Sequence, residues 1–180
     1  SGNGVFLYFE KSFFKDDVIR VTSISSNIDK FSELLALNNN SVRDLLIVDD
    51  KLFVSVDTVN QNGCTNASIL FAKISFDYLD FKEFYNPNLD YCRHLKETDN
   101  VDTVRSGARM VKYKDNKLIY TIGSYGIISQ MQSTDSLIGK IITIDLDTKE
   151  IEMISMGHRN PQGLFYDKLN DIVLVTEHGP

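Results

Sequence analysis

The residues best suited to chemistry lie in two short segments near the end of the sequence. Residues 157–164 read Gly-His-Arg-Asn-Pro-Gln-Gly-Leu, and residues 175–180 read Val-Thr-Glu-His-Gly-Pro. Arg159 offers a rigid fork of donors that suits a carboxylate or a similar acceptor oxygen, and Asn160 adds neutral donor and acceptor groups. Pro161 restricts the turn that aims both side chains. The two segments therefore predict loops shaped to hold a ligand.

The composition limits the classes of partner. The chain has 180 residues, of which 42% are hydrophobic and 24% are charged, as in a soluble globular protein with a single core. Its net charge is -6 and its basic residues are scattered, whereas binding nucleic acid requires a basic face. No apolar run approaches the roughly 20 residues of a membrane-spanning helix. We therefore expect one globular domain, residues 1–180, without nucleic acid and without a membrane span.

An internal repeat indicates how the two segments are positioned. Residues 49–56 resemble residues 115–122, and residues 170–176 form a third copy. Each copy is a polar turn followed by a strand pattern, and each follows another apolar strand pattern. A second unit alternates with the first, because residues 68–77 match residues 139–147 and a further strand pattern follows each of them. The period is thus two hairpins, or four strands.

Four-stranded antiparallel units at a fixed period are the signature of a β-propeller. The sequence therefore predicts an all-β fold of about three blades. A β-sandwich is the alternative, but it predicts no repeat. Residues 5–9 and 18–21 look like one more hairpin, and residues 29–37 are the only helix candidate of note. The expected strands are 45–48, 52–56, 69–75, 81–85, 110–113, 118–122, 140–145, 151–155, 164–166 and 172–176.

Three blades do not close a ring, since closed propellers have about four blades or more. Three blades alone would leave sheet faces and strand edges exposed. We therefore expect that a further part of a longer chain, or a second copy, completes the propeller.

The order of the segments resembles that of the soluble quinoprotein glucose and aldose sugar dehydrogenases. These are six-bladed propellers that use pyrroloquinoline quinone (PQQ) and calcium. The resemblance covers residues 105–180 and includes Tyr-Thr-Ile-Gly at 120–123 and Ser-Leu-Ile-Gly-Lys-Ile at 136–141. It implies that this chain is roughly half of such a propeller and that its substrate is a sugar or another carbohydrate.

The resemblance also assigns roles to five residues. Arg159 and Asn160 would hold PQQ, and His178 would line the cofactor edge. The backbone carbonyls of Gly179 and Pro180 would bind calcium, although calcium takes about six to eight oxygens and the remaining ligands would come from beyond Pro180. The alternative is that Arg159 and Asn160 only cap a turn of the blade.

The catalytic residues of the family are not found. In the family a His abstracts the proton of the sugar hydroxyl and an Asp orients that His, but Arg105 and Ser124 occupy the matching positions. An arginine stays protonated and cannot act as a general base. We therefore expect a relative of the sugar dehydrogenases with impaired catalysis. The alternatives are a non-catalytic propeller that binds a carbohydrate or a protein, and a calcium-dependent lactonase-type hydrolase, for which Glu177 alone is thin support.

The two cysteines, Cys64 and Cys92, flank the expected hairpin 69–85, which brings its ends together. We expect them to form a disulfide, and hence a periplasmic or extracellular location. Two free thiols are the alternative.

Overall fold

The chain is almost entirely β-structure. The computed structural model describes residues 5–9, 21–31, 42–59, 64–89 and 103–179. These residues form thirteen strands and three short 3-10 helices. The strands are β1 (Phe6–Tyr8), β2 (Thr22–Ser26), β3 (Val42–Val48), β4 (Lys51–Val59), β5 (Thr65–Lys73), β6 (Tyr78–Leu79), β7 (Lys82–Tyr85), β8 (Gly107–Lys112), β9 (Lys117–Ile122), β10 (Lys140–Asp145), β11 (Ile151–Met156), β12 (Pro161–Asp167) and β13 (Ile172–Glu177). The helices are η2 (Ile28–Phe31), η4 (Thr103–Arg105) and η5 (Ile128–Gln130).

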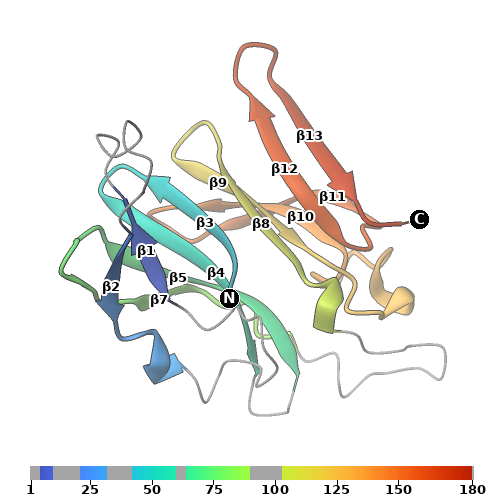
Figure 1. The fold of residues 1–180 in the computed structure, drawn as a ribbon. Coiled ribbons are helices and arrows are strands. Elements are labelled where there is room, and N and C mark those ends of the chain that lie inside the picture. Colours follow the sequence, from blue (N-terminus) through green and yellow to red (C-terminus); the bar gives the residue numbers. More distant parts are fainter. Residues whose placement is uncertain (1–4, 10–20, 32–41, 60–63, 90–102, 180) are drawn as a thin grey trace.

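Two complete propeller blades form the centre of the structure. The first blade is the sheet β3-β4-β5-β7, and the second blade is the sheet β8-β9-β10-β11; every pairing within them is antiparallel. The hairpin β12–β13 follows the second blade, and the sheet β1-β2-β6 precedes the first (Figure 1). The predicted all-β fold of four-stranded antiparallel blades, about three in number, is confirmed.

The repeat extends to the backbone conformation of the turns. Asp49, Asp115 and Asp171 lie in the turns β3–β4, β8–β9 and β12–β13, with φ values of 54°, 53° and 53°. Asp and Asn tolerate this left-handed conformation better than other non-glycine residues, because their short side chains bond to nearby backbone groups. The first two strands of each unit are therefore joined by the same kind of turn.

Several predicted boundaries were wrong. Strand β5 begins at Thr65 rather than residue 69, because polar residues in its first half are buried and bonded: Ser68 Oγ lies 2.7 Å from Thr58 Oγ1. Strand β12 begins at Pro161, which the sequence placed in a turn. Strand β2 follows the predicted segment 18–21, of which residues 18–20 lie outside the described residues. Of the predicted helix 29–37, the structure describes only the part that falls in η2.

The blades are stacked face to face, and their central strands β4, β5, β9 and β10 are buried on both sides. One face of the first blade packs against the second blade, through residues such as Phe53, Ile69 and Tyr120. The other face packs against the N-terminal sheet, and Val54 and Phe6 belong to the same buried cluster there. Strand β8 lies against β3 on one side and β12 on the other, so the first strands of three successive units gather together (Figure 1).

This arrangement brings four loop segments to one end of the blades. Because β8 and β9 are antiparallel and Gly107 pairs with Ile122, the segment before β8 and the segment after β9 lie together. Pro161 pairs with Glu177, which does the same for the segments before β12 and after β13. We call the set of residues 103–106, 123–139, 157–160 and 178–179 the loop end.

Candidate functional site

Backbone hydrogen bonds tie the segments of the loop end together. Ser124 N donates to Arg159 O at 2.7 Å, and Tyr125 N donates to Arg105 O at 3.1 Å. His178 N donates to Asn160 O at 3.1 Å. The structure thus brings Arg159, Asn160 and His178 together, as the sequence predicted for its cofactor-binding residues. Their binding of a cofactor remains a prediction.

Arg159 is held at both its backbone and its side chain. Its backbone N donates to Glu177 Oε2 at 3.0 Å, and its Nη1 donates to His178 O at 3.1 Å. Within the described ranges, no hydrogen-bond acceptor reaches its Nε or Nη2. The guanidinium is therefore anchored at one nitrogen while two others can donate to a ligand.

Asn160 is buried, with 6% of its surface exposed, and its amide is oriented by the next strand. Its Oδ1 accepts a hydrogen bond from Gln162 Nε2 at 2.6 Å. Gln162 Oε1 in turn accepts from Arg109 Nη2 at 2.9 Å. The Nδ2 group of Asn160, with its two protons, bonds to none of the described residues and can donate to a ligand.

Glu177 is the residue of this site that the sequence analysis underestimated. One of its carboxylate oxygens binds His158 Nδ1, and the other accepts from the backbone N of Arg159. His158 Nε2 lies 2.8 Å from Ser155 Oγ, so both ring nitrogens are engaged. The pair links β11 to β13 and fixes the segment that carries Arg159. Its only sequence signal was a charged residue at a strand end, 19 residues from its partner.

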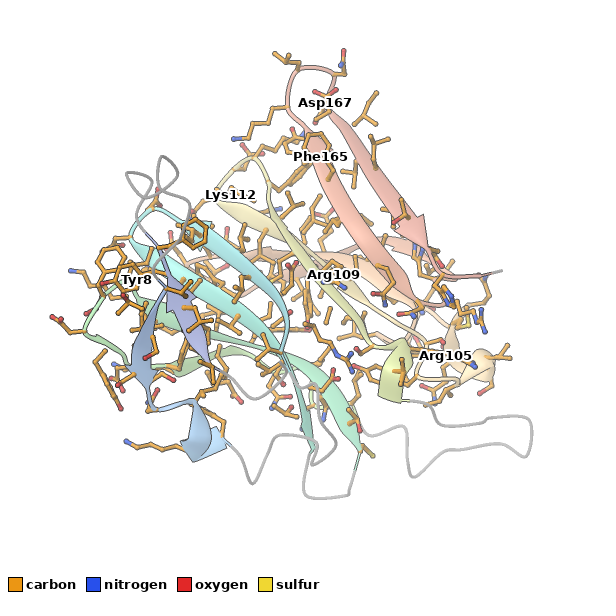
Figure 2. All side chains as sticks on the ribbon, viewed as in Figure 1. Tyr8, Arg105, Arg109, Lys112, Phe165 and Asp167 are labelled. Atoms are coloured by element: carbon orange, nitrogen blue, oxygen red, sulfur yellow. The ribbon has the colours of Figure 1, made fainter. Side chains whose placement is uncertain are left out.

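Arg105 and Ser124, which the sequence analysis aligned with the family's catalytic pair, also lie at the loop end. Arg105 ends η4, at the entrance to β8 (Figure 2). Ser124 is 1% exposed, and its Oγ accepts a hydrogen bond from Gly126 N at 3.2 Å. The Ser124 hydroxyl therefore serves its own turn.

Lys140 anchors the long segment 123–139 through hydrogen bonds to its backbone. It is completely buried, and its Nζ donates to the carbonyls of Gln130, Met131 and Ile138 at 3.2, 2.8 and 2.6 Å. Burial lowers the pKa of its ammonium below 10.5. Met131 O also accepts from Gly157 N at 3.0 Å, so the Lys140 clamp reaches the segment before Arg159. A lysine in an apolar strand gave no sequence signal for this role.

The donors of the loop end fit an anionic quinone better than they fit calcium. Arg159 and Asn160 present N–H groups, which suit carboxylate and quinone oxygens. Gly179 is the only predicted calcium residue that the structure describes, since Pro180 lies outside the described residues. In the described part, no three His, Cys, Asp or Glu residues are grouped to hold a metal ion.

Two further expectations concern the surroundings of the site. Cys64 is completely buried, and Cys92 lies outside the described residues, so the disulfide and the exported location stay predictions. Among the described residues, no helix is long and apolar enough to cross a membrane.

Known proteins share this fold. A solved glucose dehydrogenase is 18% identical with a TM-score of 0.69, over 92% of this chain and 50% of its own. The PQQ-bound aldose sugar dehydrogenase of Streptomyces coelicolor is 17% identical with a TM-score of 0.60, over 91% and 48% of the two chains. The apo soluble aldose sugar dehydrogenase of Escherichia coli is 19% identical with a TM-score of 0.56, over 73% and 40%.

The chain thus spans about half the length of these structures or less. The comparison with curated proteins found no match. The family model for glucose/sorbosone dehydrogenases matches residues 87–180, which is more than half of the chain. The chain therefore belongs to the glucose/sorbosone dehydrogenase family.

Proposed function

We propose that this chain binds PQQ through Arg159 and Asn160 and belongs to a sugar dehydrogenase-like propeller whose own sugar oxidation is impaired. The observation that carries the proposal is the pair of side chains anchored on one side with donors left over on the other. Arg159 Nη1 is fixed on His178 O and Asn160 Oδ1 on Gln162 Nε2. Such preorganised donors suit the carboxylates and carbonyls of a quinone cofactor. When bound, PQQ would supply the oxidant for a sugar or another carbohydrate.

His178 contributes to this proposed site through its backbone. Its carbonyl holds the Arg159 guanidinium and its N–H binds Asn160 O. We propose that the exposed imidazole lies at the cofactor edge. Calcium remains part of the proposal through the carbonyls of Gly179 and Pro180, with the other ligands supplied from outside this chain.

Impaired catalysis follows from Arg105 and Ser124. No general base stands at position 105, since an arginine keeps its proton at every relevant pH. Ser124 Oγ is occupied by Gly126 N, which supports the view that this position no longer orients a base. Loss of general-base catalysis costs on the order of 10²- to 10⁴-fold in rate.

The absence of a general base at position 105 also supports the second candidate, a non-catalytic propeller that binds a carbohydrate or a protein at the loop end. Val104 and Ile128 are 65% and 67% exposed there, which suits a partner's apolar surface.

We also propose that residues 1–180 form one half-propeller domain and that a further blade covers the outer face of the hairpin β12–β13. Phe165, which Figure 2 labels, pairs with Leu174, and Phe165, Ile172 and Leu174 on that face are 59%, 49% and 56% exposed. Such side chains pack between sheets in the other blades. Intact mass combined with size in solution distinguishes a longer chain from a second copy. A monomer of 180 residues would contradict the proposed ring closure.

The test of the proposed function is titration of the intact protein with PQQ in the presence of calcium, followed by a sugar oxidation assay with an artificial electron acceptor. We expect saturable PQQ binding with little or no turnover of glucose, and weaker binding by Arg159→Ala. Lys82→Met, which removes an exposed charge far from the loop end, is the control. Robust turnover would contradict the assignment of Arg105, and binding of a carbohydrate without PQQ would favour the second candidate.

A further inference from the structure

A chain of hydrogen bonds runs across the first strands of three successive units and ends at Asn160. Arg109 on β8 donates from Nη1 to Arg43 O on β3, at 2.5 Å. Its Nη2 donates to Gln162 Oε1 on β12, at 2.9 Å. Gln162 Nε2 then donates to Asn160 Oδ1 at 2.6 Å. Figure 2 shows Arg109 on β8 between the loop end and Lys112.

Arg109 and its partner Arg43 are themselves held in place. Arg43 binds the buried carboxylate of Asp57 through Nε, at 2.7 Å, and through Nη2. The backbone N of Arg109 donates to Thr121 Oγ1 at 2.9 Å. Arg109 therefore cannot turn either terminal nitrogen away without losing a bond to another blade.

Donor and acceptor rules give this chain of hydrogen bonds a direction. Arginine can only donate, so Gln162 must turn Oε1 toward Arg109. Its Nε2 then faces Asn160, which must turn Oδ1 toward Gln162. By the same rule Asn160 is left with only its two Nδ2 protons for a ligand. An asparagine that could otherwise donate or accept is thus made a donor.

We propose that Arg109 and Gln162 are positioning residues that set the orientation of the Asn160 amide, and that the loop end is thereby selective for ligands that present acceptor oxygens. The proposal rests on the proposed function, since PQQ is a ligand of this class. It also excludes groups that can only donate, such as an ammonium, as contacts of the Asn160 amide, whereas a ligand hydroxyl can contact it only as an acceptor.

Gln162→Glu is the variant that reverses the direction of these hydrogen bonds. The new carboxylate still accepts from Arg109 but offers Asn160 a second acceptor, so the Asn160 amide turns its Nδ2 toward it and its Oδ1 toward the ligand. A lost hydrogen bond to a charged ligand group corresponds to a change in affinity of about 10-fold or more. The added negative charge also weakens binding of an anion, and the Asn160→Ala background measures that effect alone.

The experiment is a double-mutant cycle in the intact protein, with the Kd for PQQ measured by equilibrium dialysis in calcium buffer. We expect Gln162→Glu to raise the Kd about 10-fold more in the parent than in the Asn160→Ala background. Equal effects in both backgrounds would overturn the proposal, because the substitution would then act without Asn160.

A second measurement needs no cofactor. The side-chain amide NMR signals of Asn160, in ligand-free protein, should move in Gln162→Glu and in Arg109→Met but not in Lys112→Met on the same strand. Unchanged signals in Arg109→Met would overturn the proposal. If the parent protein does not bind PQQ, the proposed function fails while these signals still decide whether the orienting chain exists.

Discussion

Lys140→Met should destabilise the fold and loosen the loop end at the same time. The lysine Nζ is the donor for three backbone carbonyls of the segment 123–139, at distances from 2.6 to 3.2 Å. Methionine has a similar length and fills the same space, so the substitution removes the donors and the charge without opening a large cavity.

The magnitude follows from two opposing contributions. Hydrogen bonds to a charged group contribute about 1.5–3 kcal/mol each, so losing three costs about 5 kcal/mol or more. Burying the ammonium opposes this, as its lowered pKa shows, and methionine avoids that cost. We expect a net loss of about 3 kcal/mol in the free energy of unfolding, which lowers Tm by about 6–12 °C in a protein of this size.

The assay is urea unfolding followed by circular dichroism, with Lys82→Met, an exposed lysine on β7, as the control. The pH dependence gives a second check. Between its lowered pKa and 10.5, Lys140 binds fewer protons in the folded than in the unfolded protein, so the parent should gain stability over Lys140→Met as pH rises through this window. A loss below about 1 kcal/mol would refute the clamp, and the absence of such a gain would show that burial does not lower this pKa.

Three further predictions concern the site and its support. Gly179→Ala places a Cβ 2.1 Å from Arg159 Nη1 at a φ of +79°, so it should raise the Kd for PQQ about 10-fold while costing about 1 kcal/mol in stability; equal Kd values would contradict it. Tyr120→Phe should stabilise the fold by about 1 kcal/mol in urea unfolding, because the buried Tyr120 hydroxyl bonds to no described residue; a loss would show that it has a partner. Burial raises the pKa of Asp57 above 3.8 despite the opposing Arg43, so the parent binds the extra proton when folded and should lose stability relative to Asp57→Asn as pH rises through that raised pKa; a constant difference would contradict this.

The blade architecture could be predicted because the residues that specify each hairpin lie next to one another in the sequence. A left-handed turn favours Asp or Asn, and the alternating strand patterns beside residues 49, 115 and 171 can be recognised without a distant partner. Lys140 could not be predicted, since its three acceptors are loop carbonyls and carbonyls carry no sequence signal. Pro161 was assigned to a turn because it has no N–H, yet the first residue of a strand tolerates that loss.

For the candidate site, the sequence predicted which residues gather but not what orients them. Arg159, Asn160 and His178 meet as expected, because the strands that precede and follow them are paired. Their orientation depends on Arg109 and Glu177, which lie 51 and 17 residues from Asn160 in the sequence. Hydrogen-bond direction between such distant residues is set by the packing of three units, which no local pattern reports.

The backbone contacts of Arg105 and Ser124 help to hold the loop end together. Tyr125 N binds the carbonyl of Arg105, and Ser124 N binds the carbonyl of Arg159, so both positions hold the loop end through their backbones. Gly123 allows this close approach, since a Cβ there would lie 2.0 Å from Arg105 O. The frame that carries Arg159 therefore depends on backbone groups at positions 105 and 124. Gly123→Ala should collapse that frame, which urea unfolding followed by circular dichroism would report as a loss of stability.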